Sequence, residues 1–301
     1  MLAGAKWRIK KADYSICHDE TQFSDPNLPE TSFPHYYVHP NLAKGIAATG
    51  FDECSTASNW TFDKGMSGIE RTNAALRKAG VNHSGAYTSK ESERNRIVVR
   101  TVNGVKLTHI SYTDVSDSPT LPGQPWAVNR QSPRQIAADA RAARAAGAQL
   151  VVISLAMGPM GAEDTTAAQR EAVRTITADG DVDYIIGHGS HTIQPAQMVN
   201  GTWVVWHGNL MASFFPDQPR MHEGLISRAT FTQQSDGNFR VTKLAVFPLL
   251  MVKDPGRVID LAHQKCSSVP DRWASAYSAI RATERTAIKQ GLTLAKPCSG
   301  T

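Results

Sequence analysis

The chain has 301 residues, of which 41% are hydrophobic and 20% are charged, a composition that excludes a protein disordered throughout its length. The net charge of +5 is spread without the long basic runs that are typical of nucleic-acid-binding tails, so no nucleic-acid partner is expected. No apolar run reaches the roughly 18 to 20 residues of a bilayer span, so no membrane span is predicted.

The first half of the chain is predicted to alternate strands with helices. Gly50 and Gly80 are expected to end the two helices of this half. The pair Asn103-Gly104 favours a tight turn between two apolar runs, which predicts a hairpin. In chain order, the predicted elements are a strand at residues 14–17, a helix at 41–49, a strand at 51–57, a helix at 66–79 and a hairpin at 97–112.

The second half is predicted to begin in the same way and then to lose its helices. The expected elements are a helix at 131–146, a strand at 150–155, a helix at 165–178, and strands at 184–186, 203–206, 225–232 and 241–246. We therefore expect an α/β fold of layered mixed β-sheets flanked by helices, with parallel pairing first and antiparallel pairing later. The chain is predicted to be one domain over residues 1–301, with a loop or lid at 22–40 and a C-terminal helical extension at 264–301.

Four cysteines occur in the chain, and none is in a CxxC pair, so a zinc ribbon is not supported. Cys17 and Cys54 lie in apolar runs and are expected to be small buried hydrophobic residues. Cys266 and Cys298 flank the last helical stretch, and they could form a disulfide only in an oxidising compartment.

Polar clusters occur where predicted strands end, which is the usual position of ligand-binding groups in open α/β sheets. The clusters are at residues 17–21, 58–63, 187–191 and 207–209. The other histidines, at positions 35, 39, 83, 109, 222 and 263, are expected to be surface or core residues without a group of partners.

Five segments, at residues 16–21, 51–65, 154–158, 187–191 and 208–210, carry a resemblance to a known family. In order and spacing they resemble the motifs of the CapA family of capsule and poly-γ-glutamate synthesis proteins. The segment Gly187-His188-Gly189-Ser190-His191 is similar to its Gly-His-His-x-His motif. The resemblance implies a calcineurin-like metallophosphatase-type fold.

The resemblance also implies a metal site that this chain does not complete. Trp60 and Ala156 stand where the family motifs carry histidines, and neither side chain can bind a metal ion. The family's opening strand, with its Gly-Asp ligand, has no counterpart, so an N-terminal strand is predicted to be missing or to lie upstream of an incorrectly assigned start. As written, the N-terminus has no segment of signal-peptide type, which predicts a cytoplasmic protein; an upstream start could make it secreted or cell-surface.

Glu20, Asn59, His188 and His191 are the potential ligands that remain, and a two-metal hydrolase requires a fuller set. We therefore expect no metal ion and no cofactor.

Acid and base groups have been gained near the positions where imidazoles are lost. Asp19 and His207 replace less ionisable family residues, and carboxylates and imidazoles held together can exchange protons near neutral pH. The pattern resembles a metal-independent branch of the fold, the peptide epimerases of lasso-peptide maturation, which invert an α-carbon. The expected catalytic residues are Asp19, Glu20, His188, His191 and His207, and the expected substrate-binding residues are His18, Asn59, Trp60 and Asn209.

Two other functions remain open at this point. An ordinary family member would act in capsule or poly-γ-glutamate biosynthesis, or as a metal-dependent hydrolase, with a weak or single metal ion. A catalytically inactive protein would keep the site to bind a peptide or a polyanionic polymer. Structural roles also remain open for the candidate residues: His18 and Glu20 as buried hydrogen-bonding groups, and Trp60 either as core filling or as a stacking wall. His188 and His191 could serve only the geometry of the Gly-Ser turn between them, and Asp19 and His207 could be neutral changes in an inactive site.

Overall fold

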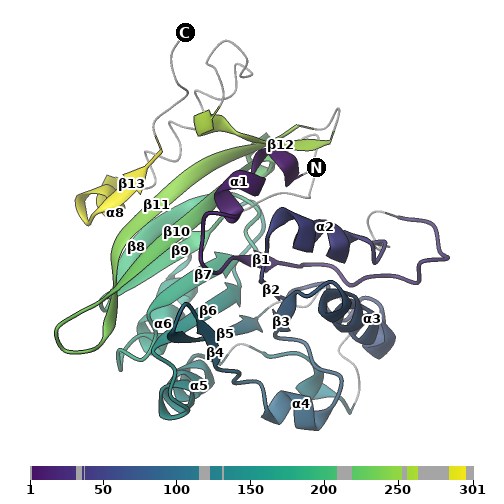
Figure 1. The fold of residues 1–301 in the computed structure, drawn as a ribbon, viewed down its shortest axis with the longest axis horizontal. Coiled ribbons are helices and arrows are strands. Elements are labelled where there is room, and N and C mark those ends of the chain that lie inside the picture. Colours follow the sequence, from purple (N-terminus) through teal and green to yellow (C-terminus); the bar gives the residue numbers. More distant parts are fainter. Residues whose placement is uncertain are drawn as a thin grey trace. The chain divides into compact units, whose positions relative to one another are not determined.

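The structure is a computed structural model that describes residues 2–31, 36, 38–114, 123–130, 132–208, 219–252, 256–263 and 285–295 (Figure 1). The chain forms two compact units. The first unit is Ile9–Met157, and the second unit combines Met1–Arg8 with Gly158–Thr301. The single domain over residues 1–301 stays a prediction.

A three-stranded parallel sheet opens the first unit, with β1 (Ile16–His18), β2 (Glu53–Ser55) and β3 (Asn82–Ser84) in the order β1-β2-β3. The helices α2 (Leu42–Thr49) and α3 (Gly65–Lys78) lie between these strands in the chain. Helix α2 ends at Gly50, whose φ of 110° gives the left-handed conformation that glycine adopts easily.

Apolar side chains from both helices and from β2 form the core of this sheet. Ile46 of α2, Leu76 of α3 and Cys54 of β2 belong to one buried cluster, together with Phe23 from the loop after β1. That loop contains no helix or strand among its described residues, and Phe23 pairs with Val38 through an isolated bridge.

A second group of strands in the first unit combines a hairpin with a buried parallel strand. β4 (Arg100–Val102) and β5 (Val105–Thr113) are antiparallel, and the turn residues Asn103 and Gly104 have φ values of 48° and 83°. β6 (Leu150–Ala156) is parallel to β5, and all seven of its residues are buried. The helices α4 (Lys90–Arg94) and α5 (Pro133–Ala145) and the short 3-10 helix η2 (Pro125–Ala127) complete the unit.

In the second unit, the chain start is attached to the C-terminal strands. This start comprises η1 (Leu2–Gly4) and the part of α1 (Lys6–Ile9) up to Arg8. The Arg8 guanidinium pairs with the buried carboxylate of Asp260 and lies 3.9 Å from the centre of the Phe247 ring. Arg8 is therefore both ion-paired and stacked on an aromatic ring, an arrangement that fixes its position.

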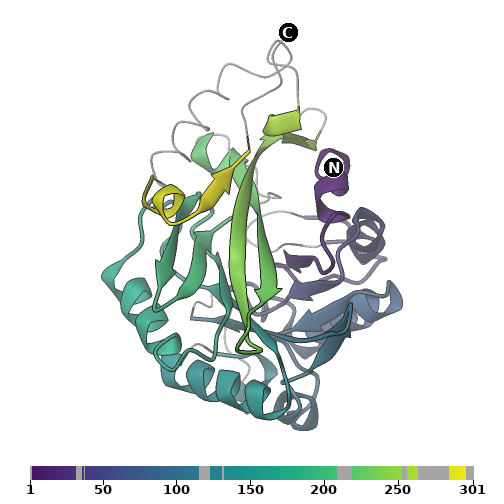
Figure 2. The ribbon, with the colours of Figure 1, turned by 60° about the vertical axis from the view of Figure 1, so that its left-hand side comes forward.

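The strands of the second unit change from parallel to antiparallel pairing along the chain. β7 (Tyr184–His188) is parallel to β9 (Thr202–His207), which is antiparallel to β8 (Gln194–Val199). Figure 2 shows the long hairpin of β10 (Glu223–Gln233) and β11 (Phe239–Val252) in green. β12 (Arg257–Asp260) and β13 (Leu292–Leu294) also pair with β11. The unit also contains η3 (Pro219–His222), η4 (Leu261–His263), α6 (Ala167–Ile176) and α8 (Arg285–Lys289).

The predicted α/β class, with mixed sheets and helices, is confirmed. The strands β3, β8, β12 and β13 and the helices α1 and α4 were not predicted from the sequence. β13 lies inside the stretch 264–301 that was predicted to be helical, and it forms a strand because it pairs with β11. No strand precedes β1 in the described residues 2–15. Residues 264–284 and 296–301 of the predicted C-terminal extension lie outside the described residues, and so do Cys266 and Cys298.

Candidate functional site

The structure brings the candidate residues together in two groups, one in each unit. In the first unit, His18, Asp19 and Glu20 lie at the end of β1 and just after it, and Asn59 and Trp60 lie in the loop after β2. In the second unit, three histidines stand at or just after the ends of β7 and β9: His188, His191 and His207. Asn209 lies outside the described residues.

The register of β1 and β2 places His18 level with Ser55 at the carboxyl ends of the two strands. His18 Nδ1 lies 2.7 Å from Ser55 Oγ, and His18 Nε2 lies 3.2 Å from Ser58 Oγ. Ser58 Oγ in turn donates to Asn59 Oδ1 at 2.9 Å. The imidazole of His18 is therefore held at both ring nitrogens, and its hydroxyl and amide neighbours form a continuous polar row.

Asp19 is buried next to this row. Its backbone N–H donates to the Ser55 carbonyl at 2.9 Å, while its Oδ2 has no hydrogen-bond partner among the described residues. Burial raises the pKa of Asp19 from its ordinary 3.8 to about 8, and the charge of the adjacent Glu20 adds to the increase. A carboxyl group with a pKa of about 8 is present in both protonation states near neutral pH, so it can act as an acid or as a base, which makes Asp19 a candidate functional residue.

Trp60 is half-buried, and its backbone forms an isolated bridge to Thr21 in the segment that follows β1. Its ring lies 5.2 Å from the ring of Tyr36 in an edge-to-face arrangement. The loop between Ser58 and Trp60 is fixed by the hydroxyl of Thr61, which accepts from the Ser58 N–H and donates to the Thr56 carbonyl, both at 2.8 Å. Trp60 therefore lies beside the polar row on a well-anchored loop.

In the second unit, His188 is the last residue of β7, and His207 is the last residue of β9. Both side chains are buried. The parallel ladder pairs Ile186 with Val205, so His188 comes level with His207 two residues further along the strands. The ring of His191 is stacked near the ring of His207, with 6.4 Å between their centres.

The loop that carries His191 has an unusual backbone. His191 has a φ of 59°, which non-glycine residues rarely adopt, and Gly189 has a φ of 114°. The conformation is held by two hydrogen bonds: Ser190 Oγ donates to the Thr192 carbonyl at 2.8 Å, and the Gly161 N–H donates to the Ser190 carbonyl at 2.7 Å. Such conformations cluster at functional sites because they persist only where the surroundings fix them.

A second polar row lies in the core of the first unit and was not predicted from the sequence. His109 Nε2 lies 2.9 Å from Ser154 Oγ, and His109 Nδ1 lies 3.3 Å from Glu53 Oε1. The hydroxyl of Tyr14 donates to Glu53 Oε2 at 2.6 Å. The expectation that His109 lacks a group of partners is wrong. Because Ser154, His109 and Glu53 are all buried, this row connects core strands and offers no access to a substrate.

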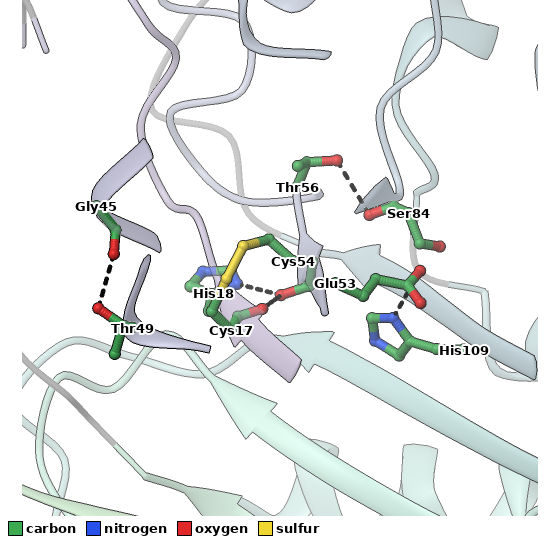
Figure 3. Close-up of a disulfide and its surroundings, with 10 residues drawn as sticks. Cys17, His18, Gly45, Thr49, Glu53, Cys54, Thr56, Ser84 and His109 are labelled. Atoms are coloured by element: carbon green, nitrogen blue, oxygen red, sulfur yellow. Dashed lines mark hydrogen bonds and ion pairs between the residues drawn. A yellow bond between two sulfur atoms is a disulfide. The ribbon is translucent and has the colours of Figure 1, made fainter. Parts of the chain in front are cut away.

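The two N-terminal cysteines, which were expected to be small buried hydrophobic residues, are joined by a disulfide; Cys54 is buried and Cys17 is partly exposed. Cys17 of β1 and Cys54 of β2 are paired in the parallel ladder, with their Cα atoms 4.4 Å apart. Figure 3 shows the bond beside His18 and Glu53. The two residues are 37 positions apart in the chain, so no local pattern indicates that they are neighbours.

The described residues do not fit the dinuclear metal site that the family resemblance implies. They contain no group of three or more His, Cys, Asp or Glu side chains placed to hold a metal ion. Trp60 and Ala156 occupy two of the implied ligand positions, and Ala156 is buried at the end of β6. Also within the described part of the chain, no helix is long and apolar enough to cross a membrane.

The fold and the candidate residues define an α/β protein with polar groups at the carboxyl ends of parallel strands, where open α/β sheets usually bind ligands. The chain belongs to the family described as bacterial capsule synthesis protein PGA_cap, which matches residues 1–212. The CapA family predicted from the sequence motifs is thereby confirmed.

Two curated relatives are similar to this chain over part of their length. The PGA biosynthesis protein CapA of Bacillus subtilis (strain 168) is 24% identical over 220 residues, which cover 70% of this chain and 55% of the relative. The capsule biosynthesis protein CapA of Bacillus anthracis is 26% identical over 165 residues, which cover 53% of this chain and 39% of the relative. This chain therefore spans about half the length of these relatives or less.

Solved structures with partial similarity include three proteins. The sulfate thiohydrolase SoxB of Thermus thermophilus is 15% identical with a TM-score of 0.46, and the match covers 81% of this chain and 38% of that chain. A 5′-nucleotidase precursor from the same species is 15% identical with a TM-score of 0.45, and the match covers 80% of this chain and 45% of that chain. The calcineurin-like phosphoesterase YfkN from Bacillus subtilis is 16% identical with a TM-score of 0.46, and the match covers 82% of this chain and 73% of that chain.

Proposed function

We propose that this protein takes part in the biosynthesis of an anionic capsule-type polymer, poly-γ-glutamate or one of similar chemistry. The observation that carries the proposal is the family match over residues 1–212, which contains all the candidate residues of both units. The names of the two curated relatives, which refer to PGA and capsule biosynthesis, support the same function.

The first unit offers suitable chemistry for a polymer that carries carboxylates. His18, Ser58 and Asn59 place imidazole, hydroxyl and amide groups in one row, and groups of these kinds can exchange their hydrogen bonds within the row for hydrogen bonds to carboxylate oxygens. The net charge of +5 favours the approach of a polyanion. Trp60 and Tyr36 supply apolar ring surface beside this row for the methylene groups of the polymer.

Binding of poly-γ-glutamate to the purified full-length protein tests this function. A fluorescently labelled polymer of defined length is titrated with protein and followed by anisotropy at two salt concentrations, with a neutral dextran as the negative probe. We expect saturable binding that weakens with salt. Replacing His18 with alanine is expected to raise the Kd about tenfold, which corresponds to about 1.4 kcal/mol.

A matched variant separates the role of the site from the loss of one imidazole. His263 is exposed, lies against the ring of Trp7 and belongs to neither group of candidate residues. His263→Ala is therefore expected to leave the Kd within twofold of the wild-type value. No binding by the wild type, or equal losses in the two variants, would count against the proposal.

Proton transfer at a peptide α-carbon is a second candidate function, and the buried carboxyl of Asp19 favours it. With a pKa of about 8, this group is available in both protonation states near neutral pH. Its carboxylate would remove the α-proton, and an acid on the opposite face would return a proton to the α-carbon. This is the chemistry of the lasso-peptide epimerases suggested by the sequence pattern.

Deuterium incorporation distinguishes this candidate from binding alone. A lasso-peptide precursor and a γ-linked glutamate oligomer are incubated with the protein in deuterium oxide and analysed by mass spectrometry and chiral amino-acid analysis. The second candidate predicts one deuterium at each inverted centre, and a loss of at least about 100-fold in Asp19→Asn. The exposed Asp13 provides the control, since Asp13→Asn should retain the full rate. Absence of deuterium in both probes would exclude it.

A further inference from the structure

The disulfide between Cys17 and Cys54 is directly connected to the polar row of the first unit. It joins the middle pair of a ladder that has only three pairs, and the next pair is His18 with Ser55. Asp19 follows two positions after Cys17, and its N–H donates to the carbonyl of Ser55. The contacts that place His18 and Asp19 therefore lie across the same pair of strands that the disulfide joins.

Strand β1 has few other connections to the sheet. It is three residues long and lies at the edge of the order β1-β2-β3, so β2 is its one neighbour in that described sheet. The residues that follow it, up to residue 31, form no helix or strand. A short edge strand with three pairs is held by few backbone hydrogen bonds, and a covalent bond at its centre restricts sliding of its register.

Packing around the two sulfur atoms determines which strand moves when the bond is broken. Cys54 is fully buried in the cluster that contains Phe23, Ile46 and Leu76, whereas Cys17 is partly exposed. Bonded sulfur atoms are about 2 Å apart, and two thiols must separate to van der Waals distance. Because Cys54 is enclosed, we expect the displacement to fall on Cys17 and β1.

We propose that the Cys17–Cys54 disulfide is a positioning element for His18 and Asp19, so that the polar row is assembled in the oxidised protein and is lost on reduction. A dithiol reagent supplies two electrons and two protons. One of its thiolates attacks a sulfur of the Cys17–Cys54 bond, which releases the other cysteine and forms a mixed disulfide; its second thiolate then attacks the reagent's own sulfur and releases the second cysteine. The products are two cysteine thiols and the cyclic disulfide of the reagent. Since such bonds persist in oxidising compartments, the state of the site would follow the redox environment.

The NMR signal of the Asp19 side chain reports on this positioning without any substrate. The protein is studied in a background with Cys266→Ser and Cys298→Ser, which confines thiol chemistry to Cys17 and Cys54. The side-chain carboxyl signal of Asp19 is followed by ¹³C NMR in the oxidised and the dithiol-reduced protein, with mass spectrometry to confirm each redox state. We expect this signal to shift on reduction, because the hydrogen bond from the Asp19 N–H to the Ser55 carbonyl crosses the two strands that the disulfide joins.

The ring signals of His18 give a second measurement, since they should change on reduction while those of His263 remain constant. The double variant Cys17→Ala/Cys54→Ala, which cannot form the bond, should match the reduced protein. Unchanged Asp19 and His18 signals in fully reduced protein would overturn the proposal. Global unfolding on reduction, seen as loss of the helical circular-dichroism signal, would also overturn it, because the bond would then hold the whole fold.

This inference rests on the proposed function only for its effect on polymer binding. If reduction shifts the Asp19 and His18 signals and the oxidised protein binds no poly-γ-glutamate, the positioning role stands and the proposed function fails. If the oxidised and reduced proteins bind the polymer with equal Kd values and give the same Asp19 and His18 signals, the function stands and the positioning role fails. We expect reduction to raise the Kd about tenfold, as in His18→Ala.

Discussion

Replacing Asp19 with asparagine is expected to remove a contribution to the free energy of unfolding that decreases between about pH 4 and pH 8. Burial, with a smaller contribution from Glu20, raises the pKa of Asp19 from 3.8 to about 8 in the folded protein. The folded state therefore holds its proton more tightly than the unfolded state does. The resulting stabilisation is complete below about pH 4, and it is lost as the pH rises toward 8.

The size of this effect follows from the pKa difference. One pKa unit corresponds to about 1.4 kcal/mol, so a shift of this size allows a loss on the order of 3 to 5 kcal/mol between pH 4 and pH 8. Asparagine has nearly the same shape and does not ionise. Oδ2 of Asp19 has no hydrogen-bond partner among the described residues, so the amide of asparagine at this position would also lack one, which lowers stability at every pH. The informative quantity is therefore the slope of the free energy of unfolding against pH and not its absolute value.

Urea unfolding at a series of pH values from about 4.5 to 9 measures this slope for the wild type and for Asp19→Asn. Asp13→Asn provides the matched control, because Asp13 is exposed and carries the same substitution six positions earlier. The control should follow the wild-type curve, whereas Asp19→Asn should diverge from it increasingly above about pH 5. Parallel curves for all three proteins would show that Asp19 is not buried as a carboxylic acid.

The regular helices and the turns were predictable because local chemistry determines them. Gly50 ends α2 and Asn103-Gly104 forms the hairpin turn, since both features depend on residues that adopt positive φ easily. The strand β3 was missed because its sequence, Asn82-His83-Ser84, is polar and short. The strand β8 was missed because it contains a proline and has no alternating pattern.

The candidate site was predictable only in part, for a related reason. Sequence patterns place His18, Asp19, Asn59 and Trp60 at strand ends, and the structure brings these residues together within the first unit. Pairings between distant segments depend on sheet register, which no local pattern reveals. The disulfide of Cys17 and the contacts of His109 with Glu53 and Ser154 belong to this class. The available signal for the contacts of His109 was the presence of a carboxylate, an imidazole and a hydroxyl in three separate apolar strands.

Gly187 is the position where a small substitution is expected to destabilise the protein most. It lies in β7 next to His188, and the backbone of β9 approaches it closely. A Cβ atom at this position would lie 1.6 Å from the Trp206 carbonyl oxygen and 2.4 Å from its carbon. These are backbone atoms of a buried strand, so they cannot rotate away as the end of a long side chain could.

Gly187→Ala is therefore expected to lower the free energy of unfolding by at least about 3 kcal/mol, because the two strands must separate to admit the methyl group. Gly45→Ala is the matched control: Gly45 is exposed in α2, and a methyl group added there would have no atom within 4 Å. Alanine in a helix is favoured over glycine by up to about 1 kcal/mol, so the control should be neutral or stabilising.

Thermal and urea unfolding of the two glycine variants and the wild type gives this comparison directly. Separation of β7 from β9 would also move His188 away from His207, since the two residues come level at the ends of these strands. The imidazole NMR signals of both histidines should therefore shift in Gly187→Ala and stay constant in Gly45→Ala. A Gly187→Ala protein with wild-type stability and unchanged histidine signals would mean that β7 and β9 are not packed as closely as the structure places them.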